Sequence, residues 1–216
     1  MEGLCLEWEA KAAAWKDREI CSIYFGGGTP SLFAQGIGAL LQTIRSQALL
    51  TADCEITVEA NPEESHLSLF ETLRAFGVNR ISLGVQSLDD RSLATLERMH
   101  TAKQAIDALL AAEKAGFRNV SIDLMYDLPD QTESSWLYTL GQLSTLPIQH
   151  LSLYNLTIEP HTAFDRRRAS LSLPGSAMSL RLLEQGVRAI EAAGIMRYEI
   201  SAFCRPFFTS RHNLGY

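Results

Sequence analysis

The sequence predicts an α/β fold in which parallel strands alternate with helices. Short runs of strand-forming residues recur along the chain of 216 residues, and stretches with apolar residues at helical spacing separate them. Crossovers of this length join parallel strands, and right-handed connections curl such a sheet into a barrel or an open doubly wound sheet. Gly116 and Gly194 support this pattern, because each stands where a helix should end shortly before a strand.

The first predicted element is an amphipathic helix over residues 2–17, in which Leu4, Trp8, Ala12 and Trp15 share one face. The chain therefore opens on a helix without a strand before it. Six strands are then expected, near residues 22–25, 55–59, 80–85, 119–124, 150–154 and 197–200. Helical stretches are expected between them, near residues 35–48, 63–76, 90–98, 103–115, 133–146 and 176–193.

Composition limits the class of protein. With 46% hydrophobic residues, the chain is long enough for one domain over residues 1–216. The net charge is −6 and the basic residues cluster only at 166–168, so no nucleic-acid partner is expected. No apolar run reaches the roughly 18 residues of a membrane span, and the first residues lack the basic start of a signal peptide. A cytoplasmic protein is expected.

Gly26, Gly27 and Gly28 form the most distinctive stretch of the sequence. Three glycines follow a short apolar strand and allow positive φ and close approach of a ligand to backbone N–H groups. Ser31 is expected to cap the next helix. Such a cradle suits a carboxylate, an amino-acid moiety or a phosphate, and a simple tight turn is the alternative.

Polar residues stand at the carboxyl ends of the predicted strands, where ligands bind in parallel α/β folds. Glu59, Gln86 and Asp123 each end a strand, and Arg98 follows on a helical stretch. Each alone is explained equally well by helix capping, but together they predict a site for a zwitterionic or ribose-bearing ligand. Arg98 adds a charge-assisted clamp.

Five separated motifs resemble those of radical S-adenosylmethionine proteins of the oxygen-independent coproporphyrinogen III oxidase group. They are YFGGGTPSL at residues 24–32, TVEANP at 57–62, NRISLGVQSL at 79–88, IDLMYDLP at 122–129 and the stretch 150–159. Residues 198–201 (YEIS) and 211–216 (RHNLGY) resemble the haem chaperone branch more than the oxidase. The resemblance implies a partial (βα)6 barrel and a role in porphyrin or haem metabolism.

The resemblance also implies the roles of individual residues toward S-adenosylmethionine. Gly27, Gly28 and Thr29 meet its methionine part, and Thr157 lies near its adenine. The amino-acid and ribose groups are bound by four side chains: Glu59, Gln86, Arg98 and Asp123.

The chain departs from this family at its beginning. Relatives start with a strand whose loop carries CxxxCxxC, and these thiolates hold a [4Fe–4S] cluster. Here the four cysteines, Cys5, Cys21, Cys54 and Cys204, form no such motif. Only Cys204 follows a strand end that could reach the mouth, and a buried or incidental thiol is the favoured interpretation of it. We therefore expect a truncated barrel without its first strand, its cluster, other metal ligands or a C-terminal domain. Its open edge predicts self-association.

Haem chaperoning requires an axial ligand, for which His212 is the preferred candidate. Two interpretations fit Phe203, Phe207 and Phe208 equally: they line an apolar slot beside it, or they are core residues exposed by the truncation. The leading hypothesis is a catalytically incomplete core that handles haem or a porphyrin and passes it to an acceptor protein. The alternatives are a non-catalytic module that carries haem or S-adenosylmethionine, and a phosphate-binding barrel enzyme that uses Gly26–Gly28.

Overall fold

One curled sheet organises the protein. The computed structural model describes residues 2–15 and 17–215, and within them seven strands pair in the order β1-β2-β3-β4-β5-β7-β6. Strands β1 to β5 run parallel in sequence order. Their bounds are β1 Glu19–Phe25, β2 Leu49–Ala60, β3 Arg80–Gln86, β4 Val120–Tyr126 and β5 His150–Asn155, followed by β6 Met196–Arg197 and β7 Ala202–Cys204.

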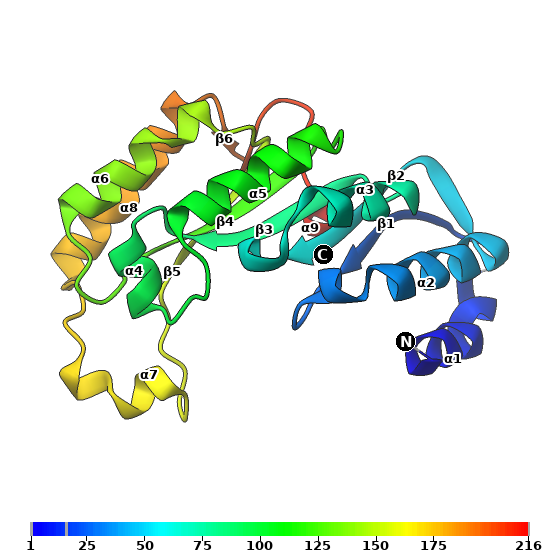
Figure 1. The fold of residues 1–216 in the computed structure, drawn as a ribbon, viewed down its shortest axis with the longest axis horizontal. Coiled ribbons are helices and arrows are strands. Elements are labelled where there is room, and N and C mark those ends of the chain that lie inside the picture. Colours follow the sequence, from blue (N-terminus) through cyan, green and yellow to red (C-terminus); the bar gives the residue numbers. More distant parts are fainter. Residues whose placement is uncertain (1, 16, 216) are drawn as a thin grey trace.

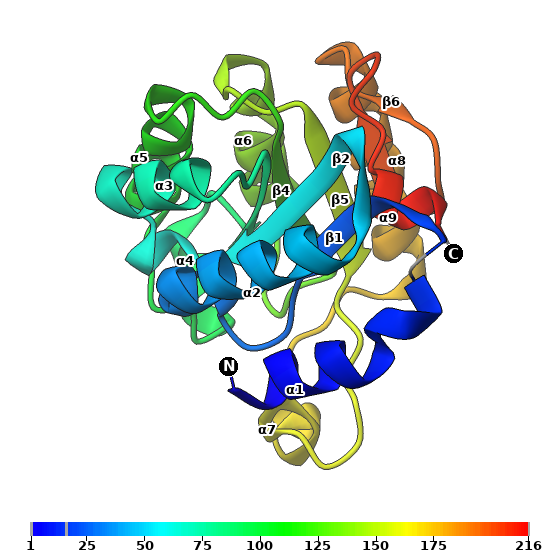
Figure 2. The ribbon, with the colours of Figure 1, turned by 90° about the vertical axis from the view of Figure 1, so that its right-hand side faces the viewer.

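Helices cover the outer side of this sheet, as Figures 1 and 2 show for α2, α3, α5, α6 and α8. The longest is α8, of 17 residues. The bounds are α1 Glu2–Lys11, α2 Ala34–Gln47, α3 Leu67–Ala75, α4 Asp90–Thr95, α5 Ala102–Lys114, α6 Glu133–Gly141, α7 Ala163–Arg166, α8 Ser176–Ala192 and α9 Arg211–Leu214.

The strands alternate between an apolar outer face and a polar inner face, because successive side chains of a strand point to opposite sides. Outward residues join the helices in one core, among them Ile56, Val58, Ile81, Leu83, Ile122 and Leu124. The residues between them are polar and face the inside of the curl: Glu55, Thr57, Glu59, Arg80, Ser82, Ser121, Asp123, His150 and Ser152. The hydrophobic core therefore lies outside the sheet, and its inside is left for polar chemistry.

The predicted fold class, a curled and mostly parallel α/β sheet, is confirmed. The predicted parallel strand over residues 197–200 is wrong: β6 ends at Arg197, and β7 runs antiparallel to both β5 and β6. Four residues link β6 to β7, and a connection this short joins only antiparallel strands. The helix predicted over residues 2–17 is divided into α1 and a 3₁₀ turn, Ala12–Trp15, and position 16 lies outside the described residues.

Strand β1 forms one edge of the sheet. An apolar groove of about 900 Å³ runs beside it, between α1 and α2, and includes Leu4, Trp8, Phe33 and Ile37 in its walls. The self-association expected through this open edge stays a prediction.

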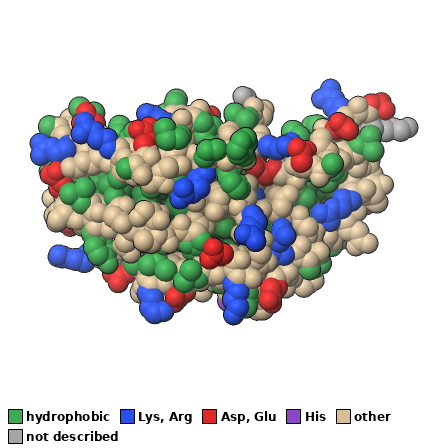
Figure 3. Space-filling view, turned by 90° about the horizontal axis from the view of Figure 1, so that it is seen from above, with side chains coloured by type: hydrophobic (Ala, Val, Ile, Leu, Met, Phe, Trp, Pro, Cys, Tyr) green, Lys and Arg blue, Asp and Glu red, His purple; other side chains and the backbone are tan. Residues whose placement is uncertain are grey.

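The surface mixes charges of both signs. On the face seen from above in Figure 3, acidic, basic and apolar side chains are interspersed. None of the helices in the described part of the chain is both long and apolar enough to cross a membrane.

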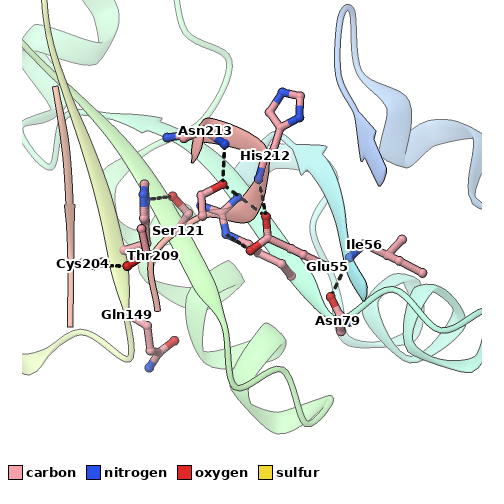
Figure 4. Close-up of polar contacts among 12 residues, drawn as sticks. Glu55, Ile56, Asn79, Ser121, Gln149, Cys204, Thr209, His212 and Asn213 are labelled. Carbon is pink, nitrogen blue, oxygen red and sulfur yellow. Dashed lines mark hydrogen bonds and ion pairs between the residues drawn. The ribbon is translucent and has the colours of Figure 1, made fainter. Parts of the chain in front are cut away.

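The C-terminal segment returns to the inside of the sheet. The hydroxyl of Ser210 and the backbone N–H of His212 both donate to Glu55 Oε1, at 3.2 and 3.3 Å (Figure 4). The Asn213 amide donates to the Tyr198 hydroxyl, which contacts His150 Nε2 at 2.8 Å. Helix α9 is thereby fixed against β1 and β2 by buried polar groups that no local sequence pattern indicated.

Candidate functional site

The glycine loop after β1 has the backbone that the sequence predicted. Gly27 and Gly28 have φ of +83° and +64°, which L-residues with side chains rarely adopt. The Gly27 N–H points to the neighbouring strand and donates to Glu59 Oε2 at 3.0 Å. The loop thus joins the site through its backbone.

Ser31 does not cap the next helix, so that prediction is wrong. It lies inside a 3₁₀ turn, Pro30–Phe33, and the residue before α2 is Phe33, without a side-chain cap. The Ser31 hydroxyl is buried and has no hydrogen-bond partner among the described residues. The turn intervenes because Pro30 starts a helical segment one turn earlier than the spacing suggested.

A cleft of about 150 Å³ lies at the carboxyl ends of β1 to β4. Its volume suits one end of a nucleoside-sized ligand, because whole ligands of that size occupy roughly 300 Å³ or more. Five predicted site residues meet there, joined by four others: Gly28, Thr29, Glu59, Gln86 and Asp123, with Ala60, Asn61, Ser82 and Gly84.

Glu59 is held in place by two donors. Besides the Gly27 N–H, the Tyr24 hydroxyl donates to Glu59 Oε1 at 2.7 Å. A carboxylate has about four acceptor positions, so both oxygens can still accept from a ligand. Glu59 is therefore an oriented acceptor for a cationic or hydroxyl group.

Asn61 links Thr29 and Arg98 to the cleft, although the sequence analysis gave it no role. Its amide donates to the Thr29 hydroxyl at 3.0 Å, and its carbonyl accepts from Arg98 Nη2 at 2.7 Å. Arg98 also donates to the Gly84 carbonyl at 3.2 Å, while its Nε is buried without a hydrogen-bond partner in the described structure. Arg98 therefore borders the cleft with one unused donor.

Asp123 faces Glu59 across the cleft. Desolvation raises the pKa of Asp123 to about 6, the negative charge of Glu59 adds to the rise, and a hydrogen bond from Ser152 opposes it. Two carboxylates in so small a space favour a positively charged ligand.

Gln86 has a positive φ of 62° at the end of β3. Such a backbone is uncommon for a residue with a side chain and persists where the surroundings enforce it. Thr157, in contrast, is exposed in the loop after β5 and is not among the residues that line the cleft. Its role near an adenine stays a prediction.

His212 lies close to this cleft, on α9. Its ring stacks on Tyr24, with 4.3 Å between ring centroids and 20° between planes. In Figure 4 the imidazole points away from Glu55, on the side of α9 opposite the polar network. The predicted haem ligand is thus partly buried and ordered by an aromatic neighbour.

The three phenylalanines expected beside His212 do not form one slot. Phe203 is 1% exposed and belongs to the core, whereas Phe207 is fully exposed with a positive φ of 72°. For Phe203 the alternative of a core residue is therefore confirmed, because it lies in β7, a strand that the sequence analysis did not predict.

The cysteines present do not fit an iron–sulfur cluster. Cys5 is on α1, Cys21 and Cys54 are on β1 and β2, and Cys204 is buried in β7. Cys204 pairs with His150 at the start of β5, away from the mouth, which confirms the favoured interpretation of it as a buried thiol. In the described ranges, no group of three or more His, Cys, Asp or Glu residues is arranged to hold a metal ion.

Two of the three residues that the sequence analysis missed share one signal. Asn61 and Ser82 line the cleft, and Tyr24 donates a hydrogen bond to Glu59, which lines it. Tyr24 and Ser82 are inward positions in strands that alternate polar and apolar residues. Following that alternation along each strand, rather than only its last residue, would have found them.

Comparison with known proteins agrees with this geometry. Residues 6–143 match the model of the Radical SAM superfamily. The chain is 42% identical over 200 residues to the heme chaperone HemW of Escherichia coli, covering 92% of this chain and 52% of the relative. It is 38% identical over 202 residues to the bovine mitochondrial radical S-adenosyl methionine domain-containing protein 1, covering 92% of this chain and 46% of that protein.

Among solved structures, coproporphyrinogen III oxidase (HemN) from Escherichia coli superimposes with a TM-score of 0.85 at 28% identity. The match covers 95% of this chain and 48% of that structure. The chain thus spans about half the length of the curated relatives it matches. The family model, the curled parallel sheet and the glycine loop with its oriented carboxylate lead to one conclusion: this chain belongs to the radical SAM superfamily.

Proposed function

We propose that this chain is the S-adenosylmethionine-binding barrel of a haem-chaperone-type protein, which carries haem and passes it to an acceptor protein. The Escherichia coli relative named as a heme chaperone and the structural match to a coproporphyrinogen oxidase support a role in haem or porphyrin metabolism. The cytoplasmic location expected from the sequence stays a prediction.

The pair of carboxylates in the cleft is the observation that carries the proposal. Glu59 is oriented by the Gly27 N–H and the Tyr24 hydroxyl, and its negative charge adds to the desolvation that raises the pKa of the neighbouring Asp123. S-adenosylmethionine brings an ammonium and a sulfonium, so it would relieve this repulsion. A phosphate would add negative charge to it, which argues against the phosphate-binding alternative.

The residues of the cleft fit this cofactor in their donors as well. Glu59 suits the ammonium, the Gly28 backbone and Arg98 suit the carboxylate, and Asp123 and Gln86 suit ribose hydroxyls. In this superfamily the cofactor supplies a carbon-centred radical when a reduced iron–sulfur cluster acts on it. We assign no such step to this chain, because its four cysteines do not converge on one point where a cluster could bind.

For haem, His212 supplies an imidazole and Tyr24 an aromatic wall. Three of the other four histidines are less suited. His100 and His150 are buried in hydrogen bonds, and His66 Nδ1 accepts from the Leu69 N–H as the cap of α3. That bond places the proton of neutral His66 on Nε2, where iron would have to bind.

Calorimetric titration with S-adenosylmethionine tests the first half of the proposal. The parent chain is expected to bind, and Glu59→Gln is expected to weaken binding about tenfold, as loss of a charge-assisted contact does. Glu71→Gln, an exposed carboxylate on α3, is the matched control and should bind like the parent. Equal affinity in the parent and Glu59→Gln would refute the assignment.

Haem titration followed at the Soret band tests the second half. His212→Ala is expected to lose the Soret shift of the parent, while His161→Ala, an exposed loop histidine, should retain it. The same Soret shift and affinity in the parent and His212→Ala would remove His212 from the site.

A further inference from the structure

One side chain, Tyr24, contacts both candidate ligand sites. Its hydroxyl donates to Glu59 at 2.7 Å, and its ring stacks on His212 with 4.3 Å between centroids. We infer that Tyr24 couples the two sites, so that S-adenosylmethionine bound at Glu59 raises the affinity of His212 for haem. This inference rests on the proposed function and concerns its regulation.

Tyr24 occupies the inner face of β1, one residue before the strand ends. From there a tyrosine reaches across to Glu59 on β2, while its ring face is left for α9. A phenylalanine at this position would keep the stack but lose the contact with Glu59. The combination of both contacts therefore depends on the tyrosine itself.

The hydroxyl remains a donor at neutral pH. Burial raises the pKa of Tyr24 above its ordinary value, and the hydrogen bond to Glu59 raises it further. Gly26 tightens the arrangement, since a Cβ there would lie 2.9 Å from the Tyr24 ring and 3.1 Å from Glu59 Oε1. The position of the ring is thus tied to the position of the carboxylate.

The two contacts couple the sites because a ligand at one site restricts the side-chain motion at the other, without a large movement of the backbone. A ligand that fixes Glu59 also fixes the Tyr24 ring, and the stacked imidazole then loses less freedom when it binds iron. A second ligand that meets an already ordered site binds more tightly, and the effect is reciprocal. Haem should therefore raise the affinity for S-adenosylmethionine by the same factor.

The test is a pair of titrations on the full chain, haem with and without saturating S-adenosylmethionine. We expect S-adenosylmethionine to raise the haem affinity of the parent about fivefold, the lower end of typical couplings. Tyr24→Phe keeps the stack but loses the contact with Glu59, so it should lower haem affinity about as much as Glu59→Gln and show a smaller factor, and Tyr24→Leu should show none. Tyr126→Phe is the matched control, because the described residues show no hydrogen bond from Tyr126 to Glu59 and no stack on His212. It should keep the parental factor.

Two further variants separate this inference from the proposed function. Without S-adenosylmethionine, Glu59→Gln should lower haem affinity about threefold by loosening Tyr24, whereas Glu71→Gln should not change it. Without haem, His212→Ala should lower the affinity for S-adenosylmethionine, also by about threefold. Each of these two titrations uses a single ligand, so the inference can be tested even when only one of the two ligands binds. Three results would overturn the inference. Tyr24→Leu could keep the parental coupling factor, or haem and S-adenosylmethionine could bind to the parent independently. Alternatively, Glu59→Gln could leave the affinity for haem unchanged and His212→Ala the affinity for S-adenosylmethionine.

Discussion

The carboxylate of Glu55 accepts a hydrogen bond from the Ser210 hydroxyl at 3.2 Å, although 155 positions separate the two residues. Both side chains are buried inside the curled sheet, and Arg80 lies 3.9 Å from the other oxygen of Glu55. The same carboxylate accepts from the backbone of His212. A residue of β2 thereby determines where the candidate haem ligand lies.

Loss of this carboxylate should therefore destabilise the protein. Glu55→Ala removes the acceptor for Ser210 and leaves Arg80 buried without its counter-charge, so we expect a loss of about 3 kcal/mol in unfolding free energy. Urea denaturation measures it. Asp53→Ala is the matched control on the same strand, because Asp53 pairs with Arg211 at the surface, where solvent screening leaves an ion pair little effect on stability. Equal losses in the two variants would contradict the anchoring role of Glu55.

His150 should make stability fall in mild acid. Burial lowers the pKa of His150 from 6.5 to about 3, and the charge of Arg80 contributes. The unfolded chain therefore takes up this proton first, so the contribution of His150 is complete above pH 6.5 and declines as pH falls toward 3. Between pH 6.5 and 5 the loss should approach about 2 kcal/mol.

The comparison of the parent with His150→Gln isolates this contribution from other acidic groups. Glutamine can still hydrogen-bond Ser121 or Tyr198 but does not titrate, so its urea midpoint should change less over the same pH range. Parallel pH profiles would show that His150 is not responsible.

Asp123 should have the opposite pH dependence. Its folded pKa of about 6 lies above the unfolded value of 3.8, so its contribution to stability is present below pH 3.8 and is lost as pH rises through 6. At pH 7 Asp123→Asn should therefore be more stable than the parent by about 1 kcal/mol, less than the full shift implies because the cleft admits water. The gain should vanish near pH 4, and the variant should bind S-adenosylmethionine more weakly. A variant less stable than the parent at pH 7 would contradict this account.

The parallel sheet and most of the cleft could be predicted because their signals are local. A strand end followed by glycines, or by Glu59 or Asp123, is visible in a few residues, and parallel strands bring such ends to one edge. Even the positive φ of Gly27 and Gly28 agrees with what three consecutive glycines permit.

The C-terminal segment could not be predicted, because its position depends on partners far along the chain. Ser210 meets Glu55, and Tyr198 meets His150 across 48 positions. Strand β7 has three residues and helix α9 four, too few for a periodic pattern. The inward position of Tyr24 is visible in its own strand, but its two contacts, with Glu59 and His212, lie on other elements and could not be predicted.

Packing of α2 on α3 offers a final prediction. Gly38 is buried in α2, and a Cβ there would lie 2.6 Å from the Phe76 ring, which follows α3. Alanine is a better helix former than glycine by about 1 kcal/mol, but the overlap forces Phe76 or the helix to move, at a cost of about 1–3 kcal/mol. We expect Gly38→Ala to lower the urea midpoint.

Gly141, in the last turn of α6, provides the control, because a Cβ there meets nothing within 4 Å. Gly141→Ala should leave the midpoint unchanged or raise it. Adding Phe76→Leu to Gly38→Ala tests the cause: when the ring is the obstacle, the second substitution costs less in the variant than in the parent. A Gly38→Ala protein as stable as Gly141→Ala would mean that Phe76 moves aside freely and that α2 does not depend on close approach to α3.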